Sequence, residues 1–202
     1  MLKVSSGENK GAKLTAPAEV RPTKAIVKNA LFNILRHHDA SAENKIFLDV
    51  FAGAGSVGIE AISNGFICVF IEKFKSVFEI LKKNLLKNKL PLSYYQFSAL
   101  KKIARIRKFE TNALIYGDAL KIIDEFNCKF DIIFIDPPYD SNLAEKIITS
   151  TNLKSILTDN GLIIVETSKK EFHCPETFTP AFQKKYGETY LYFFKHNNYN
   201  LN

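Results

Sequence analysis

Cysteine is scarce in this chain, and long hydrophobic runs are absent. The three cysteines, Cys68, Cys128 and Cys174, are widely spaced with no Cys-x-x-Cys pair, which argues against a disulfide framework and against a zinc site. The four histidines lack the spacing of metal ligands, so we expect no metal. No apolar run approaches the roughly 20 residues of a membrane span, and the first residues lack the apolar stretch of a signal peptide. We therefore expect a cytoplasmic protein that does not act at a membrane.

Acidic residues are the minority charge. Lysine and arginine total 28 against 21 acids, a net charge of +7. A basic surplus favours a polyanionic partner, because each base that meets a phosphate releases a condensed counterion, but it also serves mere solubility. The surplus is concentrated at the N-terminus, where two acids in residues 1–30 face six bases: Lys3, Lys10, Lys13, Arg21, Lys24 and Lys28.

The length of 202 residues predicts one domain with at most a small appendage. We assign residues 1–20 to an N-terminal extension or hairpin and 21–202 to the main domain. Apolar patterns predict an alternation of strands and helices, which implies an α/β fold with a parallel sheet covered on both faces. The strands are expected at 46–50, 67–72, 112–117, 130–136, 161–166 and 190–195, with helices over 23–36, 75–88, 119–126 and 142–157.

A glycine-rich turn follows the strand at 46–50 and opens a helix. It reads Asp-Val-Phe-Ala-Gly-Ala-Gly-Ser-Val-Gly over residues 49–58, and Gly53 and Gly55 would let the backbone turn tightly beside a ligand. Glu72 ends the next strand, where a carboxylate can accept hydrogen bonds from both hydroxyls of a ribose. The sequence therefore predicts a nucleoside site.

Asp49 favours S-adenosylmethionine over a dinucleotide at this site. A pyrophosphate would be repelled by the Asp49 carboxylate, whereas a cationic sulfonium ligand would not. A third acid, Asp118, follows the strand at 112–117 and could accept the adenine amino group. Each acid could instead cap a turn or helix, but acids at three successive strand ends, together with the glycines, favour the cationic ligand.

The motif Asp136-Pro137-Pro138-Tyr139 follows the strand at 130–136. The exocyclic amine of a base is a poor nucleophile, since its lone pair is delocalised into the ring. Asp136 and a backbone carbonyl fixed by the prolines could accept its two N–H bonds and free that lone pair. Tyr139 offers a flat face for stacking of the base. Asp136, Pro137 and Tyr139 are therefore the candidate catalytic residues.

With these motifs, the chain resembles the small-subunit ribosomal RNA guanine-N2 methyltransferases of the RsmD type, within the class I S-adenosylmethionine enzymes. The resemblance spans nearly the whole chain. Its more specific signs are Arg21-Pro22-Thr23 and Leu31-Phe32-Asn33-Ile34-Leu35, and other matches are Val4-Ser5-Ser6-Gly7, Glu166 and Tyr186-Gly187-Glu188-Thr189.

The resemblance implies a Rossmann-like class I methyltransferase fold. Its sheet would have seven strands, mostly parallel with an antiparallel last strand, beside a small N-terminal β extension. The implied reaction moves a methyl group from S-adenosylmethionine, leaving S-adenosylhomocysteine, to N2 of a guanine in small-subunit (16S) ribosomal RNA. The RNA would be met in the small subunit or an assembly intermediate, by a protein expected to be a monomer. The implied cofactor residues are Asp49, Gly53, Gly55, Glu72 and Asp118, and the RNA-binding candidates are Lys3, Lys10, Lys13, Arg21, Thr23 and Lys24.

Two other functions stay open at this point. The Asp-Pro-Pro-Tyr motif also serves adenine-N6 methylation of DNA or RNA, and a third possibility is a non-catalytic ribosome-assembly factor. Residues 90–111 are longer than is usual in the family. Their interleaved aromatic and basic residues suggest either an accessory RNA contact or, as the spacing of Leu100, Ile103 and Ala104 favours, an ordinary helix.

Overall fold

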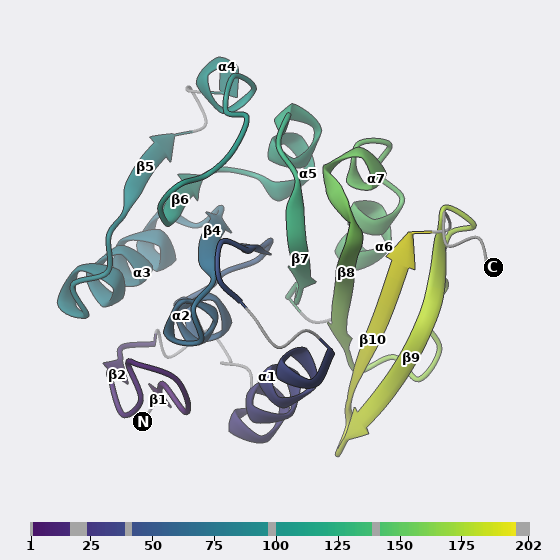
Figure 1. Cartoon of the computed structure of the whole chain (residues 1–202), viewed down its shortest axis with the longest axis horizontal. Coiled ribbons are helices and arrows are strands. Elements are labelled where there is room, and N and C mark those ends of the chain that lie inside the picture. The colour runs from purple at the N-terminus through teal and green to yellow at the C-terminus, as the bar shows by residue number, and fades with distance from the viewer. Residues whose placement is uncertain (1, 17–23, 39–41, 97–99, 139–141, 197–202) are drawn as a thin grey trace.

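The computed structural model describes residues 2–16, 24–38, 42–96, 100–138 and 142–196. Its main feature is an eight-stranded sheet in the order β5-β6-β4-β3-β7-β8-β10-β9 (Figure 1). Strand β10 is antiparallel to both of its neighbours, whereas the pairs among the first six strands of this order are parallel. The strands are β3 (Ile46–Asp49), β4 (Ile67–Glu72), β5 (Ser93–Gln96), β6 (Ala113–Tyr116), β7 (Phe130–Ile135), β8 (Leu157–Thr167), β9 (Phe178–Tyr186) and β10 (Thr189–His196).

Helices cover both faces of this sheet (Figure 1). Strands β3 and β7 are apolar and largely buried, as expected of parallel strands between two helical layers. One core cluster includes Phe47, Phe134 and Leu191 and packs under α1 (Ala25–His38), α2 (Ser56–Ser63) and α3 (Lys75–Lys87). The other cluster packs under α4 (Leu100–Ile103), α5 (Ala119–Ile122), a 3-10 turn (Ile123–Glu125), α6 (Leu143–Ile148) and α7 (Leu153–Ile156).

The N-terminal residues form a small hairpin of β1 (Leu2–Lys3) and β2 (Lys13–Leu14), docked on α1 and α2. Glu60 of α2 accepts hydrogen bonds from the backbone amides of Ser5 and Ser6, and it pairs with Lys28 of α1 at 2.9 Å. Lys28 also donates to the carbonyl of Lys3. Because both members of this ion pair are 1% exposed, the hairpin is attached through a buried charged network rather than a surface contact.

The structure confirms the α/β sheet with an antiparallel last strand and a small N-terminal β element. The sheet has eight strands where the resemblance implies seven, because Ser93–Gln96 adds β5 at the edge beside β6. That strand and α4 lie within the long stretch 90–111. Two short helices, α6 and α7, replace the single helix expected over 142–157.

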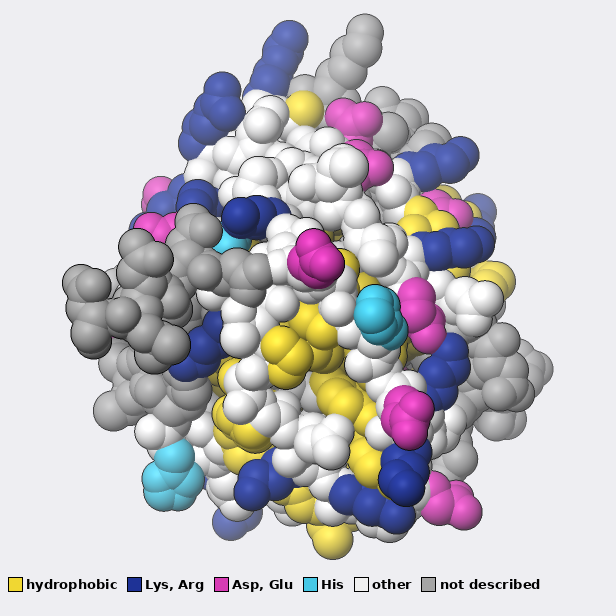
Figure 2. Space-filling view, turned by 90° about the vertical axis from the view of Figure 1, so that its right-hand side faces the viewer, with side chains coloured by type: hydrophobic (Ala, Val, Ile, Leu, Met, Phe, Trp, Pro, Cys, Tyr) yellow, Lys and Arg dark blue, Asp and Glu magenta, His cyan; other side chains and the backbone are white. Residues whose placement is uncertain are grey.

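Strand β9 forms the other edge of the sheet and escaped the sequence analysis. Residues 179–185 are all exposed, so β9 lacks the apolar alternation of a half-buried strand. Phe182 packs its ring on Phe193 of β10, with centroids 4.3 Å apart. Figure 2 shows this side of the molecule, where hydrophobic side chains form a central band with lysine and arginine side chains around it. Among the described residues, no helix is long and apolar enough to cross a membrane.

Candidate functional site

A cavity of about 440 Å³ opens at the carboxyl edge of the sheet, where β3, β4, β7 and β8 end. This is where ligands bind in open α/β sheets. Ala16 and Lys24, the described residues on either side of 17–23, also line it. The polar side chains in its lining are Lys24, Asp49, Ser56, Glu72, Lys73, Asp118, Asp136 and Glu166.

The glycine loop forms one wall of this cavity, which Gly53 lines, while Gly55 lies just behind it and is not part of the lining. Both have positive φ, 54° and 85°, a conformation that L side chains rarely adopt. A Cβ on Gly55 would also lie 2.3 Å from a methyl of Leu81. Glycine is therefore required here by conformation and by packing, and the loop can bring bare backbone against a ligand.

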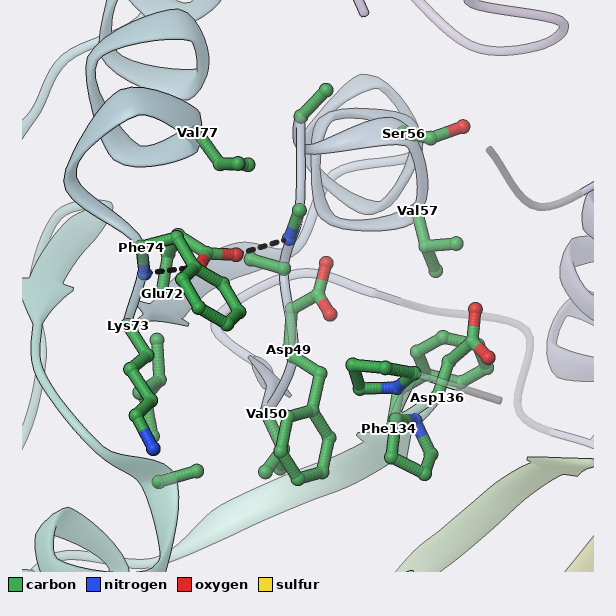
Figure 3. Close-up of a pocket in the computed structure, with 18 of the residues that line it drawn as sticks. Asp49, Val50, Ser56, Val57, Glu72, Lys73, Phe74, Val77, Phe134 and Asp136 are labelled. Carbon is green, nitrogen blue, oxygen red and sulfur yellow. Dashed lines mark hydrogen bonds between the residues drawn. The ribbon is translucent and has the colours of Figure 1, made fainter. Parts of the chain in front are cut away.

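Asp49 lies at the centre of the site, between Glu72 and Asp136 (Figure 3). It is the last residue of β3, is 2% exposed, and accepts a hydrogen bond from the amide of Gly58 at 3.0 Å. Burial raises the pKa of Asp49 to about 8, although the hydrogen bond from Gly58 lowers it. The nearby carboxylates of Asp136 and Glu72 add to the rise. A cationic ligand beside this carboxylate would favour its ionised form and lower its pKa.

Glu72 and Asp118 lie on the other side of Asp49. Glu72 ends β4 and accepts hydrogen bonds from the amides of Gly53 and Phe74, at 3.0 and 2.7 Å (Figure 3). Burial raises the pKa of Glu72, and these amides oppose the rise. Asp118 caps α5 through the amide of Leu120 and pairs with Lys73 at 3.0 Å. Glu72 thus joins the glycine loop to the end of β4, and the pair of Asp118 with Lys73 joins the end of β4 to the start of α5, which follows β6.

Asp136 follows β7 on the opposite side of Asp49, and Pro137 and Pro138 also line the cavity. Its charge is close enough to raise the pKa of Asp49, so the predicted base-binding acid and the predicted cofactor acid share one pocket. Tyr139, the fourth residue of this motif, lies outside the described residues.

The predicted RNA-binding residues divide into two groups. Lys3, Lys10 and Lys13 are exposed on the hairpin, and Lys3 lies directly opposite Lys13 across the two strands. Lys24 is exposed at the start of α1 and lines the cavity. Arg21 and Thr23, with Pro22 between them, lie outside the described residues.

Three residues of the site were missed by the sequence analysis. Phe74 lines the cavity with its side chain 59% exposed, and its position two residues after Glu72 was a signal that could have identified it. Ser56 begins α2, and within the described part of the chain its buried Oγ has no hydrogen-bond partner. Asn84 of α3 exchanges hydrogen bonds with the backbone N–H and C=O of Thr15 and donates to the carbonyl of Ala54. Sequence patterns carry no signal for such a contact.

These features fit a nucleoside that carries a cationic amino-acid tail. The unsatisfied Ser56 hydroxyl and the first amides of α2 can bind a carboxylate, which prefers a helix N-terminus. Asp49 can bind a positive charge, Glu72 a ribose, and the exposed ring of Phe74 a flat heterocycle. The cavity volume lies within the range of small-molecule sites.

The strand order, the glycine loop after β3 and the acid that ends β4 define a class I methyltransferase fold. A solved Escherichia coli structure described as a candidate methyltransferase superposes with a TM-score of 0.74 at 27% identity, covering 96% of this chain and 97% of that one.

The family model described as "Conserved hypothetical protein 95" matches residues 2–195, and the chain belongs to this family of RsmD-type methyltransferases. A Haemophilus influenzae relative named ribosomal RNA small subunit methyltransferase D is 36% identical over 170 residues, covering 83% of this chain and 79% of the relative. A Bacillus subtilis relative, YlbH, named as a candidate rRNA methyltransferase, is 30% identical over 179 residues, covering 87% of each chain.

Proposed function

We propose that this protein transfers a methyl group from S-adenosylmethionine to the exocyclic N2 of a guanine in small-subunit ribosomal RNA. The observation that carries the proposal is the placement of Asp49 and Asp136 in one cavity, close enough for their charges to interact. A donor bound at Asp49 and an amine bound at Asp136 would be neighbours. The names of the relatives support ribosomal RNA as the substrate.

S-adenosylmethionine, when bound, supplies a methyl group activated by a positively charged sulfur. The cofactor residues we propose are Asp49, Gly53, Gly55, Glu72 and Asp118. We add Ser56 and Phe74, because both line the cavity. Asp49 in its ionised form would stabilise the cationic end of the ligand, and Glu72 would accept from the ribose hydroxyls. These residues orient the donor, which is most of the work in such a transfer.

Asp136 acts on the acceptor amine. Its carboxylate oxygen accepts one N–H of the amine, and the backbone beside Pro137 offers a carbonyl for the other, so that the nitrogen lone pair turns toward the donor. As the carbon–nitrogen bond forms, the carbon–sulfur bond breaks and its electron pair stays on sulfur. The nitrogen then gives up a proton, which the carboxylate of Asp136 is placed to accept.

The experiment uses mass spectrometry of nucleosides from small-subunit RNA, and from small-subunit particles, after incubation with the protein and S-adenosylmethionine. We expect N2-methylguanosine, and a loss of at least about 100-fold in rate for Asp136→Ala, as for other groups that orient and deprotonate a reacting atom. Asp159→Ala, at an exposed acid paired with Lys129, is the control and should retain full activity. N6-methyladenosine as the product, or undiminished methylation by Asp136→Ala, would contradict the proposal.

A further inference from the structure

Glu166 is a second carboxylate on the acceptor side of the cavity. It lies near the end of β8, is 5% exposed, and lines the same cavity as Asp136. Ile135 pairs with Val165 in the parallel ladder of β7 and β8, so the next residues, Asp136 and Glu166, are neighbours on adjacent strands. On its other side, Glu166 pairs with Leu191 of β10. Its backbone is therefore fixed between two strands, which a residue needs if it is to discriminate between ligands.

The acids follow one another along the carboxyl edge of the sheet. Glu72 ends β4, Asp49 ends β3, Asp136 follows β7 and Glu166 lies at the end of β8, and these four strands are adjacent in that order. Adjacent strands are about 4.8 Å apart. In the proposed function the ribose lies at Glu72, the sulfonium end at Asp49 and the reacting amine at Asp136. The group next in line, at Glu166, is the rest of the hydrogen-bonding edge of the base.

The chemistry of that edge differs between the two candidate bases. Guanine presents two kinds of donor side by side, the N2 amino group and the N1–H. Adenine presents its N6 amino group beside N1, which carries a lone pair and accepts. An ionised carboxylate can only accept hydrogen bonds. A second carboxylate beside the amine-binding acid therefore complements guanine. With adenine, the carboxylate oxygen would face the N1 lone pair, and two hydrogen-bond acceptors would repel each other.

We propose that Glu166 is a specificity-determining residue, which accepts the N1–H of the target guanine while Asp136 accepts from N2. The inference rests on the proposed function and deepens it, because it states why this pocket selects guanine over adenine. A site built to hydrogen-bond a donor discriminates strongly against an analogue that lacks it, since a buried acceptor is left unpaired.

The test changes the hydrogen-bonding edge of the base beside its amino group. The target guanine is first located by mass spectrometry of nuclease fragments of the methylated RNA, and it is then replaced by 2-aminopurine in a ligated small-subunit RNA. This base keeps the amino group at C2, but it lacks the O6 oxygen and its N1 accepts instead of donating. We expect the wild-type protein to prefer guanine by at least about 100-fold in kcat/KM. In Glu166→Gln, whose amide can donate to N1, we expect the preference to shrink by at least about tenfold, mainly because 2-aminopurine improves.

The ratio of the two substrates is an internal measure, since a variant that is partly unfolded loses activity on both equally. Glu145→Gln is the matched control, because Glu145 of α6 pairs with Lys169 outside the cavity lining and should leave the ratio unchanged. A second measurement needs no variant. RNA with inosine at the target keeps N1–H but lacks the amine, and it should compete with the substrate better than the 2-aminopurine RNA does.

The outcomes separate this inference from the proposed function. If the wild-type protein makes N2-methylguanosine but methylates 2-aminopurine equally well, the role of Glu166 is wrong and the proposed function stands. The same holds if Glu166→Gln is active with an unchanged ratio. If Glu166→Gln is inactive on both bases, the inosine and 2-aminopurine competition decides. If the wild-type product is N6-methyladenosine, both proposals fall.

Discussion

At the scale of single residues, Asp49 has the largest consequence. Its carboxylate is buried at the end of β3, with Asp136 and Glu72 nearby, and its pKa is raised to about 8. In the ligand-free protein at neutral pH it is therefore mostly a neutral acid. A cationic ligand binds the ionised form, so binding below pH 8 must release a proton.

We expect the affinity for S-adenosylmethionine to rise with pH between about 6 and 8, by up to about tenfold per unit, as Asp49 loses its proton. Calorimetric titration in two buffers of different ionisation enthalpy measures the protons released per ligand bound. The release should approach one at the lower end of this range. Asp49→Asn is the control, since it has no proton to lose there. Equal proton release by the variant would show that another group titrates.

The same residue predicts a change in stability without ligand. Because its pKa is higher in the folded protein than the ordinary 3.8, the stabilising contribution is complete below about pH 4 and is lost as the pH rises to about 8. Asp49→Asn keeps an acceptor for the Gly58 amide but cannot ionise. We expect its Tm to exceed that of the wild type at pH 8 and the difference to shrink toward pH 4. A difference that is constant with pH would contradict this reading of Asp49.

At the scale of elements, α2 must approach β4 closely for the glycine loop to keep its place. A Cβ on Gly58 would lie 2.2 Å from a ring carbon of Phe70 and 2.7 Å from the sulfur of Cys68. We expect Gly58→Ala to destabilise the fold by about 1–3 kcal/mol, because α2 must shift outward, and to weaken cofactor binding. Urea unfolding and calorimetry measure the two effects.

Gly187→Ala is the matched control for that change. Gly187, unlike Gly58, has positive φ, and a Cβ there would have no atom of the described residues within 4 Å, so only backbone strain of about 1 kcal/mol is expected and cofactor binding should be unaffected. An equal loss of cofactor affinity in both variants would show that the close approach of α2 is not what positions the loop.

Asn84 links α3, the glycine loop and the N-terminal segment. Its replacement by alanine would remove the partners of both backbone groups of Thr15 and of the Ala54 carbonyl, all at 2.8–2.9 Å. We expect Asn84→Ala to destabilise the protein by about 1–3 kcal/mol and to speed hydrogen exchange in residues 12–16, next to the cavity. Asn88→Ala removes a single bond, to the Asn84 carbonyl, and should leave exchange in 12–16 unchanged. Unaltered exchange there in Asn84→Ala would contradict the link.

At the scale of the whole molecule, the basic surplus is placed unevenly. Lys3 and Lys13 are exposed and directly opposite each other on the hairpin, an arrangement that is unfavourable without a nearby anion. The hairpin is tied to the core by the buried pair of Lys28 and Glu60, and Ala16, two residues after it, lines the cavity. We infer that the hairpin presents these lysines to RNA beside the site.

Binding of small-subunit RNA should therefore weaken steeply with salt, and the double variant Lys3→Gln with Lys13→Gln should lower the slope of log K against log salt by about 1.5. The control pair is Lys129→Gln with Lys154→Gln. These lysines precede β7 and β8, so they lie at the amino ends of the strands, away from the cavity at the carboxyl ends. Filter binding at several salt concentrations measures both. Equal slopes for the two double variants would exclude the hairpin as the RNA contact.

Local patterns predicted most of the fold. Strand β4 has the bounds that its apolar run indicated, and α3 and β10 differ by a residue or two. Strand β9 was missed, because its residues 179–185 are exposed on both faces and so have no burial pattern. Strand β5 was missed because its four residues are too short for a periodic signal. Both strands are held by pairing with β10 and β6, which is a tertiary contact.

The amino-acid sequence by itself determined the kinds of chemistry available: a glycine loop, acids at the ends of successive strands and an Asp-Pro-Pro-Tyr motif. The spacing of these motifs along the chain was enough to predict that they share one site, because the carboxyl ends of parallel strands lie at the same edge of the sheet. Three properties were decided only by the tertiary structure, because they depend on burial and on neighbouring groups. They are the raised pKa of Asp49, the hydrogen bonds between Asn84 and Thr15, and the order of strands that places Glu166 beside Asp136. Those properties depend on groups distant in sequence, so no local pattern encodes them.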